Sequence, residues 1–313
     1  MNIIKYRYLY FAISLFVIIP GIIALILWRL PLGIDFTGGS LLEVQFSSGI
    51  SPAIADVAAL YNEMSTAQMD VSNPVVQPVG TDSLSIRSKE MSDALKSQIV
   101  AALKDRYGDG KDVVIMNFTQ VSAVIGQEIA VRAAGAVALA AIAILLYITY
   151  AFRGVQHSFR YGTAAIIAML HDVLVVIGAE AILGHFLGWQ ADSLFLTALL
   201  TVIGFSVHDT IVVFDRIREN SNIYRRVGYE TIVNHSIVQT LDRSINTQLT
   251  VMLTLLALAL FGGASIRHFV VILLVGVFSG TYSSIFNASP ILVVWENKEW
   301  RNWFRRKQIP DPS

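Results

Sequence analysis

The sequence of 313 residues contains no cysteine, so disulfide bonds, thiolate catalysis and cysteine-based metal sites are excluded. Charged residues are also scarce, at 15% of the chain, and their signs cancel to a formal net charge of zero. Nucleotide-binding loops of the Gly-x-Gly-x-x-Gly and Gly-x4-Gly-Lys types are missing, as is any nucleophile–base pair. These absences argue against an enzyme, and we expect no cofactor and no nucleic-acid partner.

Apolar residues, in contrast, make up 54% of the chain, more than the roughly 45–50% of ordinary soluble domains. They gather into runs of the length that a helix needs to cross a hydrocarbon core of about 30 Å. Three runs are nearly continuous and three are interrupted: 9–28, 133–152 and 194–214, then 161–184, 242–263 and 268–295. The sequence therefore predicts an α-helical polytopic membrane protein with six transmembrane helices. We expect the first helix to stay uncleaved, because no small-x-small site follows it.

Basic residues beside these runs predict the orientation of the chain. Fourteen Lys and Arg lie before the first helix, after the second and fourth helices and in the C-terminal tail, which are all on one side of the membrane. The short loops on the opposite side, 184–193 and 262–268, contain only Arg267. Because positively charged loops remain in the cytoplasm, both termini are expected there.

One long polar segment, residues 30–128, separates the first two helices and is predicted to form an outer domain. It carries twelve acidic and six basic residues, so its net charge is about −6. Apolar patterning predicts strands at 42–46, 75–76, 84–86 and 113–120, with helices at 53–64 and 92–108. The order β-α-β-β-α-β is that of a ferredoxin-like α+β sandwich; another small α/β topology is the alternative.

The chain is thus expected to divide into four segments. These are the N-terminus with the first helix (1–29), the outer domain (30–128), the remaining five helices with a cytoplasmic loop at about 215–240 (129–295), and a basic cytoplasmic tail (296–313).

Ionisable residues inside the predicted spans form a candidate site, because charge in a bilayer is costly and is usually functional or paired. The third helix carries His171 and Asp172 near its middle and Glu180 nearer its outer end, and the fourth carries His208 and Asp209. Two His–Asp pairs can suggest a metal site. Adjacent residues diverge by about 100° on a helix, however, and no third element adds ligands, so no metal is predicted.

The fifth helix is predicted to begin at Arg243, followed by Asn246 and by a polar face of Thr247, Thr250 and Thr254 at spacings of 4, 7 and 11 from Arg243. At 1.5 Å per residue, Arg243 and Asp209 both lie about 22–28 Å below the outer surface, so antiparallel neighbours can pair them. Two interpretations remain open. The pair is either a structural ion pair, or a carboxylate that binds protons while the arginine shifts its affinity.

The sixth helix contains Gly276, Gly280, Ser283 and Ser284 on one face. Small residues at this spacing let membrane helices approach closely, so Gly276 and Gly280 are predicted to be helix-packing positions.

Four segments of the chain together resemble the SecF family of protein-export membrane proteins, which is related to the resistance-nodulation-division transporters. These are GIDFTGGS at 33–40, VHDTIVVFDRIREN at 207–220, TLDRSINT at 240–247 and GTYSSIF at 280–286. Helix count, orientation and the place of the outer domain also fit, so the resemblance covers nearly the whole chain.

The resemblance implies a non-enzymatic subunit of the bacterial inner membrane that uses the proton motive force to promote preprotein translocation. The implied partners are SecD with its own six helices, the SecYEG channel with SecA and YajC, the translocating preprotein and membrane lipids. By motif, Asp209 matches the proton-carrying aspartate, Arg243 its partner and Asp172 a further acid. Asp35, Gly38 and Gly39 match the hinge to the outer domain.

Supporting positions beside the predicted proton-conducting residues are His171, His208, Asn246 and Thr247. At His208 the chain departs from the family, where we expect Asn before the aspartate. A titratable neighbour can alter the proton affinity of Asp209, or simply keep the hydrogen bond.

Two other functions compete with this interpretation. One is a small-molecule or lipid exporter of the same superfamily, but such chains usually carry two large outer domains and about twelve spans. The other is a non-transporting assembly scaffold whose buried charges only hold helices together, and dependence on a proton gradient would distinguish it.

Overall fold

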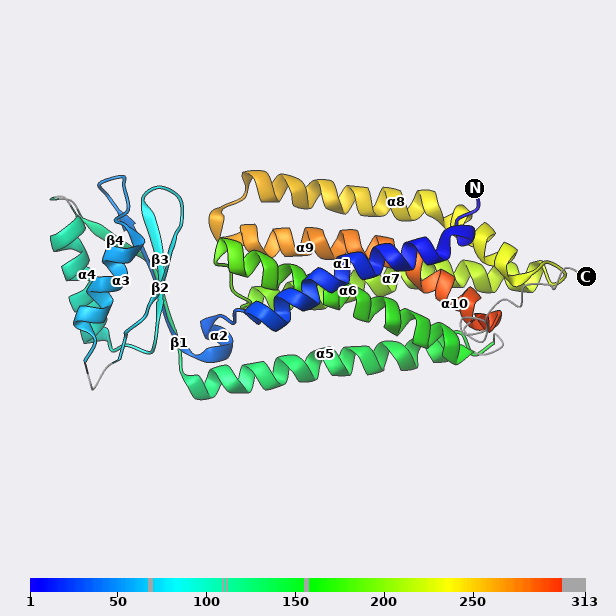
Figure 1. The fold of residues 1–313 in the computed structure, drawn as a ribbon, viewed down its shortest axis with the longest axis horizontal. Helices are drawn as coiled ribbons and strands as arrows, with labels where there is room; N and C mark the ends of the chain where they lie inside the picture. Colours follow the sequence, from blue (N-terminus) through cyan, green and yellow to red (C-terminus); the bar gives the residue numbers. More distant parts are fainter. Residues whose placement is uncertain (67–69, 109, 111, 155–157, 300–313) are drawn as a thin grey trace, which may run out of the picture.

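The computed structural model describes residues 1–66, 70–108, 110, 112–154 and 158–299. Figure 1 shows a small sheet-and-helix domain at one end of a long helical bundle, with the N-terminus and α10 at the opposite end. The basic tail expected at 296–313 lies outside the described residues from position 300 onward.

Six helices of the described chain are long and apolar enough to cross a membrane, as predicted. Five are α1 (Arg7–Trp28), α5 (Ala123–Ala151), α6 (Ser158–Leu187), α7 (Ser193–Ile223) and α8 (Tyr229–Phe261). The sixth consists of α9 (Ala264–Ser283), the π-helical turn η2 (Ser284–Ala288) and α10 (Ser289–Glu296). Short elements complete the bundle: η1 (Ile4–Tyr6) and the one-turn helix α2 (Ile34–Thr37). The chain is a multi-pass membrane protein.

Three helices extend beyond their predicted ends. Helix α5 begins at Ala123, inside the segment assigned to the outer domain, where the Ser122 side chain caps it. The segment 215–240 was predicted as a loop, but it is helical apart from residues 224–228. Arg243 does not begin the fifth helix, because α8 starts at Tyr229. Hydropathy marks where a helix meets lipid, whereas the backbone helix continues through polar residues into water.

The interruption within the sixth span was not predicted. Pro290 lies in the first turn of α10 and has no N–H with which to bond the carbonyl one turn earlier. The π-helical turn η2 immediately precedes it. Such turns are rare and often occur at functional sites, and here the turn places Ser284 and Asn287 inside the bundle.

The outer domain has the predicted element order: β1 (Gly39–Phe46), α3 (Ile54–Met64), β2 (Val75–Pro78), β3 (Ser83–Ser88), α4 (Asp93–Tyr107) and β4 (Val113–Val121). The strands lie in the order β2-β3-β1-β4 and all pair antiparallel. The inward residues of β1, Leu42, Val44 and Phe46, are fully buried under α3 and α4. The Ser92 side chain caps α4 by accepting a hydrogen bond from Leu95 N. The ferredoxin-like sandwich is confirmed.

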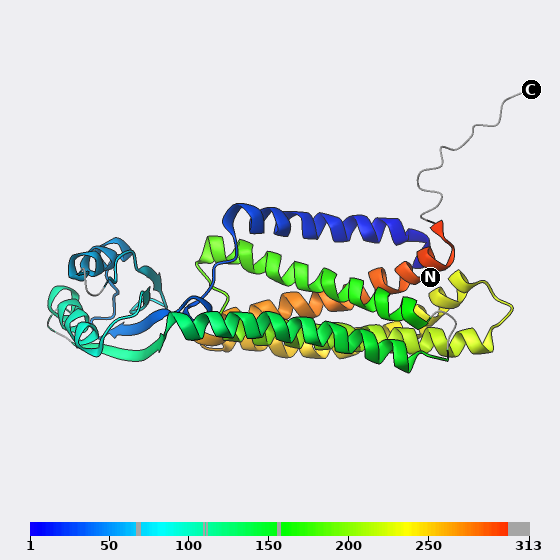
Figure 2. The same cartoon turned by 90° about the horizontal axis from the view of Figure 1, so that it is seen from below.

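In the bundle, α9 lies at the centre, between α6, α7 and α8, and α1 crosses the outer face of α6 (Figure 2). The crossing of α1 over α6 is close, because a Cβ added at Gly21 would lie 2.9 Å from Gly178 Cα. This arrangement brings the buried polar residues of α6, α7 and α9 together inside one apolar core.

Candidate functional site

Asp172 on α6 is completely buried where α6 meets α7 and α9. Its Oδ2 accepts hydrogen bonds from the hydroxyls of Ser206 and Ser283, each at 2.6 Å. Its Oδ1 accepts one from Ser279 at 2.6 Å and lies 2.9 Å from Nδ1 of His171. An ionised carboxylate only accepts hydrogen bonds, and these four contacts match that form. Asp172 therefore ties three helices together.

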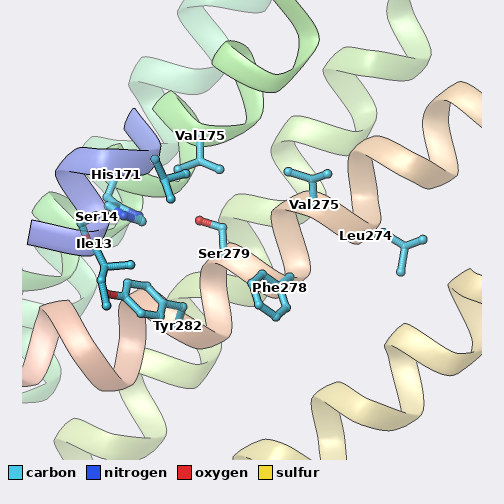
Figure 3. A pocket seen from close by; sticks show the side chains of 10 residues that line it. Ile13, Ser14, His171, Val175, Leu274, Val275, Phe278, Ser279 and Tyr282 are labelled. Atoms are coloured by element: carbon cyan, nitrogen blue, oxygen red, sulfur yellow. The ribbon is translucent and has the colours of Figure 1, made fainter. Parts of the chain in front are cut away.

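One ring nitrogen of His171, Nδ1, forms a hydrogen bond with Asp172. The other ring nitrogen, Nε2, is buried without a hydrogen-bond partner among the described residues. The ring borders an apolar cavity of about 410 Å³ between α1, α6 and α9. Figure 3 shows Ser14, Ser279 and Tyr282 around the same space. His171 thus orients the buried acid from the edge of a cavity.

Asp209 on α7 is also buried, at 4% exposure, but its surroundings differ from those of Asp172. The side-chain amide of Gln248 on α8 donates a hydrogen bond to its Oδ2. Gln248 is itself buried, and its carbonyl oxygen has no partner in the described part of the chain. Within the described part of the chain, Asp209 is therefore an acid that is hydrogen-bonded by a single neutral amide.

Arg243 does not pair with Asp209, since no ion pair within 4 Å joins these two described residues. The inward face of α8 follows a four-residue spacing through Ser236, Thr240, Ser244 and Gln248. Arg243 precedes Ser244 by one position and is therefore turned by about 100° out of the bundle. It is exposed, as are the other polar residues of that side, Asn246, Thr247, Thr250 and Thr254.

His208 is also exposed, turned by about 100° around α7 from the buried Asp209. Of the predicted residues, the structure thus brings His171 and Asp172 together, while Asp209, Arg243 and His208 point in different directions. Among the residues that the structure describes, no group of three or more His, Cys, Asp or Glu could hold a metal ion.

Gly276 and Gly280 lie where α9 meets α7. A Cβ added at Gly276 would lie 2.1 Å from a methyl carbon of Val202, and one at Gly280 would lie 3.2 Å from Ser206 Cα. The absence of both side chains lets α9 come close enough for Ser279 and Ser283 to reach Asp172.

Sequence reasoning missed the residues that hold the two acids. The sequence pattern predicts only a packing role for Ser283 and no role for Ser206, Ser279 or Gln248. Hydroxyl and amide residues within membrane helices were the available signal, because a polar group in the apolar core needs a partner. Nothing in the sequence identified which acid each of them would meet.

Comparison with known proteins gives the family. The model described as "Protein export membrane protein SecD/SecF, C-terminal" matches residues 99–298, and the "SecD/SecF GG Motif" model matches residues 29–50. The "Protein translocase subunit SecF" of Anaerolinea thermophila is 56% identical over 99% of both chains. This chain belongs to the SecF family.

Other SecF relatives extend the comparison. The "Protein translocase subunit SecDF" of Bacillus subtilis is 33% identical over 94% of this chain, which spans only 38% of that longer protein. The crystal structure of SecDF from Thermus thermophilus, described as a translocon-associated membrane protein, superposes with a TM-score of 0.81 at 30% identity. The match covers 95% of this chain and 39% of that one. Like its SecF relatives, the chain is a protein translocase subunit.

The SecF GG-motif segment joins α1 to the outer domain through α2. Gly38 and Gly39 have φ angles of 76° and 128°, in the region that favours glycine. A Cβ at Gly38 would lie 2.5 Å from Ala123 Cα, and one at Gly39 would lie 2.5 Å from the carbonyl oxygen of Ser88. Asp35 accepts hydrogen bonds from the backbone N, at 2.8 Å, and from the hydroxyl of Ser193, at the start of α7. The segment is thus held against α5, α7 and β3.

Proposed function

We propose that this chain works with a SecD partner as a SecDF-type translocase, which uses the proton motive force to promote preprotein movement through the SecYEG channel. SecA and YajC would meet the complex at that channel. The proposal is supported by the SecDF relatives, in which the part similar to this chain makes up about two fifths of a longer protein. The remainder leaves room for a second membrane half, which a separate SecD chain would supply.

The observation that carries the proton-coupled part is the contrast between the two buried acids. Asp172 has four hydrogen-bond contacts, three of them with hydroxyl donors, and this set matches its charged form. Asp209 accepts a hydrogen bond from one neutral amide, that of Gln248. If this amide rotates by half a turn, its carbonyl oxygen can accept a hydrogen bond from the protonated form of the acid. The partnerless oxygen of Gln248 is already buried beside Asp209. Asp209 is therefore the group that we assign to proton binding, and Asp172 acts as a fixed anion in this conformation.

Arg243 would act together with the partner. An exposed arginine within a membrane span is costly unless another helix or water covers it, and the polar residues beside it extend along the same side of α8. We assign this side to contact with SecD, which would bury Arg243 and increase its influence on the charge of Asp209. The same contact would exclude lipid from Asn246 and Thr247.

The orientation follows from the charges of the loops. With the 14 basic residues of one side in the cytoplasm of a bacterium, both termini lie there and the acidic domain lies outside the inner membrane. The GG-motif segment at Asp35, Gly38 and Gly39 would then act as the hinge through which that domain moves as it contacts a preprotein. The chain has no native cysteine, so single cysteines can be labelled cleanly. A cysteine at Ser97 should react with an impermeant maleimide from outside and one at Asn222 only from inside.

The function is tested by export into inverted membrane vesicles that contain the channel and the complex. A proton gradient should stimulate export, and an uncoupler should remove the stimulation. Gentle detergent extraction should recover this chain together with a second six-span protein. If gradient and uncoupler have no effect on export while the complex is intact, the chain is a scaffold and the proposal is wrong.

A further inference from the structure

A third buried acid, Glu180, lies on α6 two turns outward from Asp172. Its side chain is completely buried, and Oε2 lies 2.7 Å from Nε2 of His268 on α9. Its other oxygen, Oε1, is buried without a partner among the described residues. Helices α6 and α9 are thus joined at two levels, by Glu180 and His268 near the outer end and by Asp172 and Ser279 deeper in the bundle.

The two levels differ in chemistry. Asp172 meets three hydroxyls, which carry no charge in either state, and the buried imidazole of His171. Among the described residues, Glu180 meets only the imidazole of His268, and an imidazole can take up a proton near neutral pH. The His268 side chain is 15% exposed and lies near the start of α9, whereas Glu180 is closed off.

No other ionisable group offsets the charge of Glu180 in the described part of the chain. On α6, His185 stacks on Trp28. In the loop before α7, Asp192 accepts a hydrogen bond from Phe195 N as the cap of that helix. Arg29 at the end of α1 and Arg267 beside His268 are both exposed, and neither forms an ion pair with Glu180. A carboxylate without compensation is costly to bury, so the imidazole is its available source of positive charge.

His268 also touches the structure that holds the outer domain. Its ring lies against the indole of Trp189, with centroids 4.9 Å apart. Trp189 belongs to the loop 188–192. The outer domain contacts this loop through Gln77, whose side-chain amide donates a hydrogen bond to the backbone oxygen of Gly188. The same loop is joined to the segment after α1 by two backbone hydrogen bonds: Gly33 N donates to Ala191 O at 2.7 Å, and Ala191 N donates to Pro31 O at 2.8 Å.

We propose that Glu180 and His268 form a proton-exchange site at the outer end of α6 and α9, and that Trp189 transmits its charge state to the outer-domain junction. A proton from outer water binds the free imidazole nitrogen, and the couple changes from net −1 to neutral. On release, the proton leaves the same imidazole nitrogen and returns to the outer water. The imidazolium attracts the electron-rich face of Trp189, so the loaded site holds the 188–192 loop more firmly. Use of this site in export would rest on the proposed function, but proton exchange itself does not.

The test uses the full complex in lipid vesicles with Trp189 as the only tryptophan, the other four of this chain and those of the partner chain being replaced by phenylalanine. An imidazolium quenches a neighbouring indole more than a neutral imidazole does. The emission of Trp189 should therefore fall as the pH is lowered between about pH 9 and 5, the range in which histidines titrate. His268→Gln should abolish this change, and Glu180→Gln, which leaves the imidazole without its carboxylate partner, should alter the pH range over which it occurs.

The matched control is His185→Gln, since His185 lies at the same end of α6 but stacks on the side chain at position 28, which is a phenylalanine in this background, and not on Trp189. It should leave the Trp189 titration unchanged. If Glu180→Gln fails to assemble, the double variant E180Q/H268Q keeps an amide pair in place and should show no titration. A pH-independent Trp189 emission in the parent, or a titration that survives His268→Gln, would overturn the site.

The coupling to the junction has its own readout. Spin labels on cysteines at Ser97 in the outer domain and Asn222 at the far end of the bundle report the spread of distances between them. The spread should be wider at high pH than at low pH, and E180Q/H268Q should remove the difference. An equal spread at both pH values in the parent would show that the site does not act on the junction. Neither readout involves export, so failure here leaves the assignment of Asp209 untouched, and failure of that assignment leaves these results unchanged.

Discussion

Gln248 on α8 donates a hydrogen bond to the buried carboxylate of Asp209 on α7. The arginine expected in that place lies five residues earlier and points out of the bundle. Because a glutamine carries no charge, it holds the acid without fixing its protonation state. This difference separates two roles that the sequence had placed in one ion pair: an amide that positions the acid, and an arginine that is available to a partner.

The first prediction concerns Asp209. Asp209→Asn keeps the shape of the side chain and removes its titratable proton, so export should fall to the level seen with an uncoupler while assembly persists. The measurement is gradient-stimulated export in vesicles. The control is Asp215→Asn on the same helix, because Asp215 is exposed and paired with Arg218 at 2.5 Å. It should export normally, and stimulation that survives Asp209→Asn would contradict the assignment.

The second prediction concerns the exposed polar side of α8. A photo-cross-linking residue at Thr250 should capture the SecD-type partner, because this side is open in the isolated chain. The same residue at Ser244, which is buried against the bundle, should cross-link within the chain. Mass spectrometry of the products distinguishes the two. Capture of the partner from Ser244 and not from Thr250 would reverse the proposed interface.

Arg243 is tested on the same surface. Arg243→Met should reduce gradient-stimulated export, and Arg243→Lys should restore part of it, since lysine keeps the charge but not the planar geometry. Arg226→Met, at an exposed position between α7 and α8, is the control. Equal effects of Arg243→Met and Arg226→Met would mean that the location of Arg243 on α8 does not matter for gradient-stimulated export.

The third prediction concerns the donors to Asp172. Ser279→Ala should lower the free energy of unfolding by about 1.5–3 kcal/mol, the usual contribution of a hydrogen bond to a charged group. Thr254→Ala removes an exposed hydroxyl whose one hydrogen bond among the described residues goes to the backbone of its own helix, so its effect should stay within about 0.5 kcal/mol. Reversible unfolding in detergent checks both. Equal effects would show that Asp172 does not depend on its donors.

The fourth prediction concerns the contact between α9 and α7. Gly276→Ala places a methyl group where Val202 already lies, so the chain should lose about 1–3 kcal/mol. Val202→Ala in the same chain should recover part of this loss by making room. Gly204→Ala is the control on α7, because nothing lies within 4 Å of its added Cβ. It should be neutral or stabilising by up to about 1 kcal/mol, as alanine favours a helix. The free energy of unfolding of the isolated chain is measured for each of these variants.

Most of the fold could be predicted from local patterns. Span length follows directly from bilayer thickness, and the alternation in the outer domain distinguishes its strands from its helices. Residues 42, 44 and 46 show the strand period and are buried together. The ends of the helices were less predictable, because α7 and α8 continue into polar segments that hydropathy interprets as a loop.

The candidate site likewise has features that the sequence predicts and features that depend on the tertiary structure. The sequence by itself determined that the chain crosses a membrane six times, carries one outer α+β domain and buries acids at Asp172 and Asp209, since each of these follows from residue type and local period. Only the tertiary structure decided what meets each acid. A rotation of 100° between adjacent residues separates Ser244 from Arg243, and no local pattern states which side of α8 faces α7. The close approach at Gly276, the serine donors around Asp172 and the pairing of Glu180 with His268 all depend on how distant helices pack, because each contact joins residues far apart in the chain.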